Sequence, residues 1–350
     1  MLRSRYLALA CAAAAAAAAV AAAVLLLRAR PRRAPATTPQ LPAAPTTILL
    51  VDNGSLHAAS YLSLCAMAEA VSAATGLPVL PASARFADRI PPGELQGRAG
   101  ETLASALARA LAPGAQAAGA RHRHVLILPA FFGPADPLKK FVPEQVALAG
   151  ARAAEAAAAG ARAPLRVTHS LARPLAAPGE LRLAAALATG VAGVLRARGL
   201  APEGAAVALC DHGSPSAEVG RVRGLVAGQL ADALRAAGLL ARLRAPLAQA
   251  SMERRPGSEY DYNEPLLATL LRSAPYNEGD VVLALLFLSP GAHAGPGGDI
   301  DEIVAEAVAE AAGQGRALRV HRTPLLGPSV TEVLADRLRE AVSELSASEL

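Results

Sequence analysis

The feature that most constrains the fold of this 350-residue chain is an internal repeat. An apolar run that ends in VDNGS, at Ser55, recurs as an apolar run that ends in CDHGS, at Ser214, with an offset of 159 residues. Two further pairs follow in the same order. Pro134 of LILPAFFGPADP matches Pro290 of LALLFLSPGAH at an offset of 156, and LRVTHSLARPL matches LRVHRTPL at an offset of 153. Offsets this similar predict a duplicated chain with halves of roughly 45–200 and 204–348.

Each half alternates short Val/Leu/Ile-rich runs with helical patterns. Residues 281–288 form an uninterrupted apolar run, which is typical of a strand buried on both faces. A Gly/Pro-rich loop follows this run, and Asp299 is then placed to cap a helix with an apolar stripe. Strands that alternate with helices predict right-handed βαβ units and parallel sheets. The predicted fold is therefore α/β, with two lobes related by a pseudo-twofold axis, each a parallel sheet flanked by helices.

The N-terminal segment differs in composition from the rest of the chain. Residues 6–27 are uncharged and mostly alanine, with two arginines before them and four after them. This run is long enough to span a bilayer, and the flanking arginines favour a membrane anchor at 1–30 with a cytoplasmic-facing body. A cleaved signal peptide or an organelle transit peptide is the alternative. Residues 31–46, rich in Pro, Ala and Thr, are expected to be a linker to lobes at 47–200 and 204–348.

Charge and cysteine content exclude several classes of function. The net charge is +5, but six arginines lie within residues 1–33, where no acidic residue occurs, so the remainder sums to −1. A near-neutral body with few aromatic residues argues against nucleic-acid binding. The three cysteines, at positions 11, 65 and 210, form no CxxC pair. We expect Cys65 and Cys210 to be small buried apolar residues, with no disulfide framework or iron–sulfur cluster.

Two histidines follow strands of the second half. His212 comes after the strand that ends near Cys210, and His293 comes after the strand at 281–288. Ligands of parallel sheets bind at the carboxyl ends of the strands, so we expect these two side chains to meet there. The alternative is that each is a hydrogen-bonded loop residue.

The remaining histidines and motifs give weaker signals. His122 and His124 are expected to be solvated and His57 to lie at the surface, whereas His169 and His321 are candidates for lining the crevice. Nucleotide-binding glycine motifs, HExxH and GxSxG are absent from the sequence. Ser214 is expected to cap the following helix rather than to act as a nucleophile.

The segments VALCDHGSP and LLFLSPGAHAGPGGDI resemble the paired signatures of the class II tetrapyrrole chelatases. These are the sirohydrochlorin cobalto- and ferrochelatases of cobalamin and sirohaem synthesis, and the resemblance extends from Thr46 to the C-terminus. The first half departs from the pattern, because Asn53 replaces one histidine and Pro137 aligns with His293. The resemblance thus implies an active second lobe and a structural first lobe.

The resemblance also implies a set of site residues. His212, His293 and Glu253 are the expected catalytic and metal-binding residues, because the family places a glutamate near Glu253; Glu264 is the second choice. Neutral imidazole is a good ligand for Co²⁺, Fe²⁺ and Ni²⁺. The ordinary pKa of a histidine side chain, about 6.5, also lets it accept protons at cellular pH. The substrate of the family carries many carboxylates. We therefore expect Arg221, Arg223, Arg254 or Arg255 to pair with them, the alternative being that each is a solvated arginine.

The leading hypothesis is an ATP-independent lyase that inserts Co²⁺ or Fe²⁺ into sirohydrochlorin or a related tetrapyrrole. The divalent metal is then a substrate, and no tightly bound cofactor is expected. The alternative is a non-catalytic, membrane-tethered carrier of tetrapyrrole or metal that kept the fold. Both second-half histidines favour the enzyme, whereas the altered first half and the N-terminal segment favour the carrier.

Overall fold

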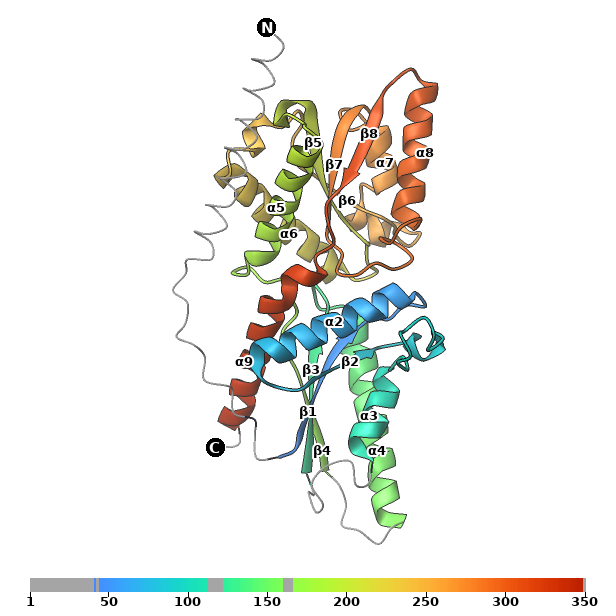
Figure 1. Cartoon of the computed structure of the whole chain (residues 1–350), viewed down its shortest axis with the longest axis vertical. Coiled ribbons are helices and arrows are strands. Elements are labelled where there is room, and N and C mark those ends of the chain that lie inside the picture. The colour runs from blue at the N-terminus through green and yellow to red at the C-terminus, as the bar shows by residue number, and fades with distance from the viewer. Residues whose placement is uncertain (1–40, 42–43, 113–121, 160–165, 349–350) are drawn as a thin grey trace. The chain divides into compact units, whose positions relative to one another are not determined.

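The computed structural model describes residues 41, 44–112, 122–159 and 166–348, which form two compact lobes (Figure 1). The described part of the first lobe comprises residues 41, 44–112, 122–159, 166–175, 289–291 and 330–348. The second lobe comprises residues 176–288 and 292–329. The predicted anchor and most of the predicted linker lie outside the described residues. Within the described part of the chain, no helix is both long and apolar enough to cross a membrane.

Each lobe contains a parallel sheet, as the repeat predicted, and each sheet has four strands. The first sheet has the order β2-β1-β3-β4 and the second has the order β6-β5-β7-β8. The strands are β1 (Thr46–Asp52), β2 (Val79–Ser83), β3 (His122–Pro129), β4 (Arg166–Leu171), β5 (Ala205–Asp211), β6 (Ala248–Ser251), β7 (Gly279–Leu285) and β8 (Leu318–Arg322). The three repeated sequence pairs are therefore β1 with β5, β3 with β7 and β4 with β8.

Helices cover both faces of each sheet, which explains why the central strands are apolar along their length. The α-helices are α2 (Ala58–Thr75), α3 (Leu103–Leu111), α4 (Val142–Ala159), α5 (Arg182–Ala197), α6 (Ala217–Ala236), α7 (Leu267–Arg272), α8 (Asp299–Gly313) and α9 (Thr331–Ser348). Shorter helical turns are η1 (Ala87–Arg89), η2 (Pro137–Phe141), η3 (Pro202–Gly204), η4 (Leu240–Arg242), η5 (Ser258–Asn263) and η6 (Gly327–Val330). In the first lobe α2 and α9 pack together, as do α3 and α4; in the second lobe the pairs are α5 with α6 and α7 with α8.

The lobes differ from the two sequence halves in their last helices. Helix α5, which ends the first half of the sequence, packs against α6 and β7 in the second lobe. Helix α9, which ends the second half, packs against α2, β3 and β4 in the first lobe. The predicted boundaries at 47–200 and 204–348 therefore describe the duplication, whereas each folded lobe contains a helix from the other half.

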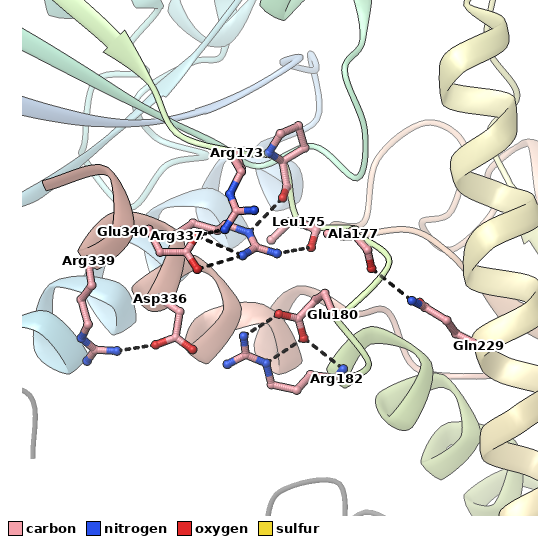
Figure 2. A network of polar contacts seen from close by, with 11 residues as sticks. Arg173, Leu175, Ala177, Glu180, Arg182, Gln229, Asp336, Arg337, Arg339 and Glu340 are labelled. Carbon is pink, nitrogen blue, oxygen red and sulfur yellow. Dashed lines mark hydrogen bonds and ion pairs between the residues drawn. The ribbon is translucent and has the colours of Figure 1, made fainter. Parts of the chain in front are cut away.

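Polar side chains fix α9 to the segment after β4 (Figure 2). The Arg337 guanidinium donates to the carbonyl oxygens of Pro174, at 3.1 Å, and Leu175, at 3.4 Å. The Arg173 guanidinium in turn forms an ion pair with Glu340 of the same helix at 2.7 Å. In the second lobe, Gln229 of α6 donates to the Ala177 carbonyl at 3.1 Å and so binds the segment that leads into α5.

Three local predictions can be compared with the structure. Cys65 and Cys210 are buried free thiols, and burial raises the pKa of both, as expected of inert core residues. Asp299 begins α8 but is not its cap: Gly298 occupies that position, and the Asp299 carboxylate binds elsewhere. Ser214 does not cap α6 either, because Ser216 is the residue before the helix; the Ser214 hydroxyl accepts the Ser216 N–H instead.

Candidate metal site in the second lobe

His212 is positioned by a tight contact between the loops after β5 and β6. Gly213 has φ +88°, and a Cβ at this position would collide with the carbonyl oxygen of Glu253. Glycine is therefore required here for both its backbone angle and its lack of a side chain. The Glu253 N–H donates to the His212 carbonyl at 3.1 Å, which holds the two residues side by side.

His293 is positioned by a compact turn at the start of α8. The Asp299 N–H donates to the carbonyl of Ala292 and the Ile300 N–H donates to the carbonyl of His293, each at 3.1 Å. A Cβ on Gly298 would collide with the Ala292 carbonyl oxygen, so the turn closes only around glycine. The turn brings His293 to the carboxyl end of the sheet, where His212 lies.

The two imidazoles meet through their Nε2 atoms, which lie 3.1 Å apart. The ring centroids are 4.4 Å apart and the rings cross at 84°. This confirms the sequence-based expectation that the two strand ends bring these residues together across 81 positions. Two imidazole ligands on a tetrahedral ion, with metal–nitrogen bonds of about 2.0–2.1 Å, place their nitrogens about 3.3 Å apart. The observed separation therefore suits a shared ion.

The partners of the Nδ1 atoms fix the tautomer of each ring. His212 Nδ1 lies 2.9 Å from the carbonyl oxygen of Gly213, and His293 Nδ1 lies 2.6 Å from Asp299 Oδ2. Both partners only accept hydrogen bonds, so each Nδ1 carries the proton and each neutral ring presents an Nε2 lone pair. Two lone pairs at this distance repel unless a proton or a cation lies between them. The histidine pair is therefore suited to bind one proton or one metal ion between its Nε2 atoms.

Glu253 supplies a carboxylate next to this pair. Its Oε1 lies 3.6 Å from His212 Nε2, and 59% of its side chain is exposed. Over the residues that the structure describes, no group of three or more His, Cys, Asp or Glu side chains is arranged as a closed metal site. The arrangement is therefore an open one, with two nitrogen donors and an exposed carboxylate, and an open site allows a metal ion to leave as well as to enter.

Arg223, predicted to bind substrate carboxylates, is instead part of the interior. Its guanidinium is 4% exposed and pairs with Asp211 at 3.3 Å. It also bonds to the Ser251 hydroxyl and to the carbonyl oxygens of Tyr262 and Asn263. Burial raises the pKa of Asp211, and the Arg223 charge opposes that rise. The prediction for Arg223 was wrong, because the buried carboxylate one residue before His212 requires this cation.

The other predicted residues fall into two groups. Arg254 forms ion pairs with Asp261 at 2.7 Å and Glu264 at 2.8 Å, and Glu264 also accepts the Leu266 N–H. These contacts organise the loop after β6, and the structure does not bring Glu264 into contact with the histidine pair. Arg221 and Arg255 are exposed and make no ion pair with the described residues, so both keep their guanidinium groups accessible.

The remaining histidines lie away from the pair. His124 is buried rather than solvated, with its ring nitrogens 2.8 Å from Thr168 Oγ1 and 3.0 Å from Ser170 Oγ; His122 also reaches Thr168. Its burial corrects the prediction, and the cause is the hydroxyl-bearing face of β4. His321 binds Asp280 at the amino end of β7, whereas the histidine pair lies at the carboxyl end of the same sheet. His57 and His169 are exposed.

The first lobe repeats the loops but not their metal donors. Asn53 follows β1 where His212 follows β5, and Pro137 begins η2 where the repeat places His293. Asp52 corresponds to Asp211, but Leu64 stands where α6 carries Arg223, because α2 and α6 begin 159 residues apart. Asp52 Oδ1 is buried and has no hydrogen-bond partner in the described part of the chain. Burial raises the pKa of Asp52 to about 6, although the Ser83 hydroxyl lowers it in part.

Sequence reasoning missed two residues. Asp299 orients His293, and its position six residues later, at the start of a predicted helix, was the available signal. Arg85 occupies the place of Glu253 in the first lobe, where the Ala84 N–H donates to Asp52 O as the Met252 N–H donates to Asp211 O. The β2 and β6 segments share too few identical residues for the sequence to show a fourth repeated pair.

Comparison with known proteins agrees with this architecture at the level of structure. No family model matches the sequence, and no curated protein matches it. SirB from Bacillus subtilis with Fe³⁺ superposes with a TM-score of 0.54 at 17% identity, covering 87% of this chain and 98% of that one. The sirohydrochlorin chelatase SirB from Bacillus subtilis subspecies spizizenii in complex with cobalt gives 0.53 at 17% identity, covering 87% and 97%. The chain therefore has the class II chelatase fold of the SirB sirohydrochlorin chelatases.

Proposed function

We propose that the protein is an ATP-independent metal chelatase that inserts a divalent ion into a tetrapyrrole. The observation that carries this proposal is the pair of histidine Nε2 atoms, 3.1 Å apart, at the carboxyl end of the second sheet. The fold supports the proposal, since solved structures that share it are a sirohydrochlorin chelatase with cobalt and its relative with Fe³⁺. The specific reaction is insertion of Co²⁺ or Fe²⁺ into sirohydrochlorin or a close relative.

The reaction needs a loosely held metal ion and a base for two protons. The divalent ion forms four bonds to the pyrrole nitrogens, and the two pyrrole N–H groups lose their protons. In the proposed site the imidazoles hold the incoming ion. Once the ion has moved to the macrocycle, the freed Nε2 atoms are proton acceptors, and the exposed Glu253 carboxylate beside them can pass protons to water.

Second-lobe contacts prepare both rings for this role. The Gly213 carbonyl and the Asp299 carboxylate fix the Nδ1 protons, so neither ring needs to change tautomer when it binds the ion. A carboxylate behind a ligating histidine also fixes the orientation of its ring. Arg221 and Arg255 are the remaining accessible candidates, among the four arginines predicted, for pairing with substrate carboxylates.

A spectral assay with paired variants tests this function. The purified chain is incubated anaerobically with sirohydrochlorin and Co²⁺ or Fe²⁺, and the visible spectrum is followed. We expect conversion by the unmodified protein, loss of conversion in His212→Ala and in His293→Ala, and near-normal conversion in Asn53→Ala, the matched position of the first lobe. Thermal melts check that all three variants remain folded.

The outcomes separate the enzyme from the carrier. Tetrapyrrole or metal binding without conversion would refute the chelatase and support a carrier that kept the fold. Equal inactivity of Asn53→Ala and His212→Ala, with both folded, would show that the first lobe takes part directly.

The cellular location is a separate part of the proposal and depends on residues 1–33 alone. We propose a membrane-anchored protein with its body on the cytoplasmic side, because arginines flank the uncharged run at 6–27. Cleavage of this segment, as in a signal or transit peptide, is the competing outcome. Fractionation of cells that express the chain with a C-terminal tag distinguishes a membrane-bound form from a processed one.

A further inference from the structure

The first lobe carries a site that corresponds, position by position, to the metal site of the second lobe. Gly54 has φ +85° and faces the Arg85 carbonyl so closely that a Cβ would collide with it, as Gly213 faces the Glu253 carbonyl. The Ala84 N–H donates to Asp52 O at 2.9 Å, and the Met252 N–H donates to Asp211 O at 2.8 Å. These matching contacts place Arg85 at the position of Glu253.

The side chains at these matched positions have the opposite character. Where the second lobe has the imidazole of His212 and the carboxylate of Glu253, the first lobe has the amide of Asn53 and the guanidinium of Arg85. An amide with no second donor is a poor metal ligand, and a guanidinium repels cations. The first-lobe site is therefore unsuited to a metal ion, and its charge suits an anion.

The Arg85 guanidinium is held in a defined place. Its Cζ lies 4.9 Å from the centre of the Phe141 ring, in a cation–π contact. Arg85 follows β2 and Phe141 ends η2, which follows β3, and β1 lies between these two strands in the sheet. Arg85 and Phe141 therefore come from the segments that follow the two neighbours of β1, and Asn53 follows β1 itself. The guanidinium makes no ion pair with any described residue, and stacking leaves its N–H edge free for a carboxylate.

The surroundings add positive charge and apolar surface. Lys140, next to Phe141, is exposed, and Asp136 is the one acidic residue in the segment 136–141. The side chain of Leu56, two residues after Gly54, is 58% exposed. A ligand that fits this combination has a carboxylate for the guanidinium and an apolar body for the exposed side chains.

We propose that Arg85, stacked on Phe141 beside Asn53, is a carboxylate-binding site made by reversing the charge of the duplicated metal site. Its ligand class is an apolar molecule that bears carboxylate groups. The identification of that ligand as the polycarboxylated tetrapyrrole substrate rests on the proposed function. Binding to Arg85 is metal-independent and does not require the histidine pair.

Titration with a metal-free macrocycle tests the site without the insertion reaction. The probe is uroporphyrin I, whose side chains are all carboxylates, and binding to the full chain is followed by the quenching of its fluorescence. We expect Arg85→Gln to weaken binding at least tenfold, Arg85→Glu to weaken it further, and Arg85→Lys to recover part of it, since a bidentate ion pair becomes a single-point one. Arg89→Gln is the matched control, because Arg89 lies in the same loop and also faces an aromatic ring, Phe86, at 5.4 Å.

One further measurement completes the test. A cationic porphyrin of similar size should bind Arg85→Gln and the unmodified protein with the same affinity. Equal affinities of Arg85→Gln, Arg89→Gln and the unmodified protein for uroporphyrin I would overturn the carboxylate site, whether or not the protein inserts metal. Loss of binding in Arg85→Gln alone would support the site even if metal insertion fails.

Discussion

Asp52 and Asp211 occupy equivalent positions at the ends of β1 and β5, yet we expect their replacement by asparagine to have opposite effects on stability. Asp211 has the buried guanidinium of Arg223 at 3.3 Å, whereas the matching position near Asp52 holds Leu64. Among the residues that the structure describes, no cation stands beside the buried carboxyl group of Asp52. Asp52→Asn removes the ionisable group and keeps an oxygen that can accept hydrogen bonds.

The magnitude follows from the raised pKa of Asp52, which is about 6 in the folded chain against an ordinary value of 3.8. The difference of roughly 2 between these two pKa values corresponds to about 3 kcal/mol of the free energy of unfolding. Because the folded pKa is the higher one, the stability contributed by neutral Asp52 is fully present below about pH 4. It is lost as pH rises through about 6. As the pH rises from 4 to 7.5, the free energy of unfolding of Asp52→Asn should therefore increase relative to that of the unmodified protein, by up to about 3 kcal/mol.

Asp211→Asn should instead destabilise the protein by about 3–5 kcal/mol, because it leaves Arg223 buried without an anion. Urea unfolding of both variants and of the unmodified chain, followed by circular dichroism between pH 4 and pH 8, measures both effects. The diagnostic quantity for Asp52→Asn is the change with pH of its stability difference from the unmodified protein. A difference that stays constant over this range, or destabilisation of equal size in both variants, would refute the argument from the missing arginine.

Three other predictions follow from the site and from the N-terminal boundary. The affinity for Co²⁺ should fall at least tenfold from pH 7.5 to pH 5.5, because a protonated imidazole has no lone pair to donate; calorimetric titrations that agree at both pH values would remove the histidines from the site. Asp299→Asn should lower Co²⁺ affinity about 10–100-fold by loosening the orientation of His293, with the thermal midpoint and the uroporphyrin I affinity unchanged. A chain that begins at Ala44 should stay folded, because it keeps the Pro45 carbonyl that accepts the His124 N–H; aggregation with loss of its circular dichroism would disprove that boundary.

The sequence contained enough information for the fold and for the histidine pair. The repeat, the apolar runs and the strand-end rule together predicted two parallel sheets and brought His212 to His293. These inferences succeeded because strand order and burial depend on the pattern of apolar residues, which a sequence displays directly.

The sequence did not show in the same way which helix packs against which sheet, or which side chains bind each other. The apolar stripe of α5 or α9 shows that a helix buries one face, but not which sheet covers it. Arg223 lies next to apolar positions of α6, and only the buried Asp211 explains why a charged side chain occupies the interior. Asp299 was expected to cap a helix, because an aspartate at a helix start can accept the backbone N–H groups there. In the structure its carboxylate accepts from His293 Nδ1 instead. The sequence does not show which of these donors the carboxylate binds.

The exchange of α5 and α9 gives the chain an unusual order of assembly. During synthesis the four strands of the first sheet leave the ribosome about 160 residues before α9 does, so one face of that sheet remains partly uncovered while the whole second lobe is made. A chaperone that shields apolar surface during this interval would act on the earlier lobe, not on the one being translated. A nonsense mutation shortly before residue 331 would likewise damage the lobe encoded first and leave the strands and histidines of the lobe encoded last intact.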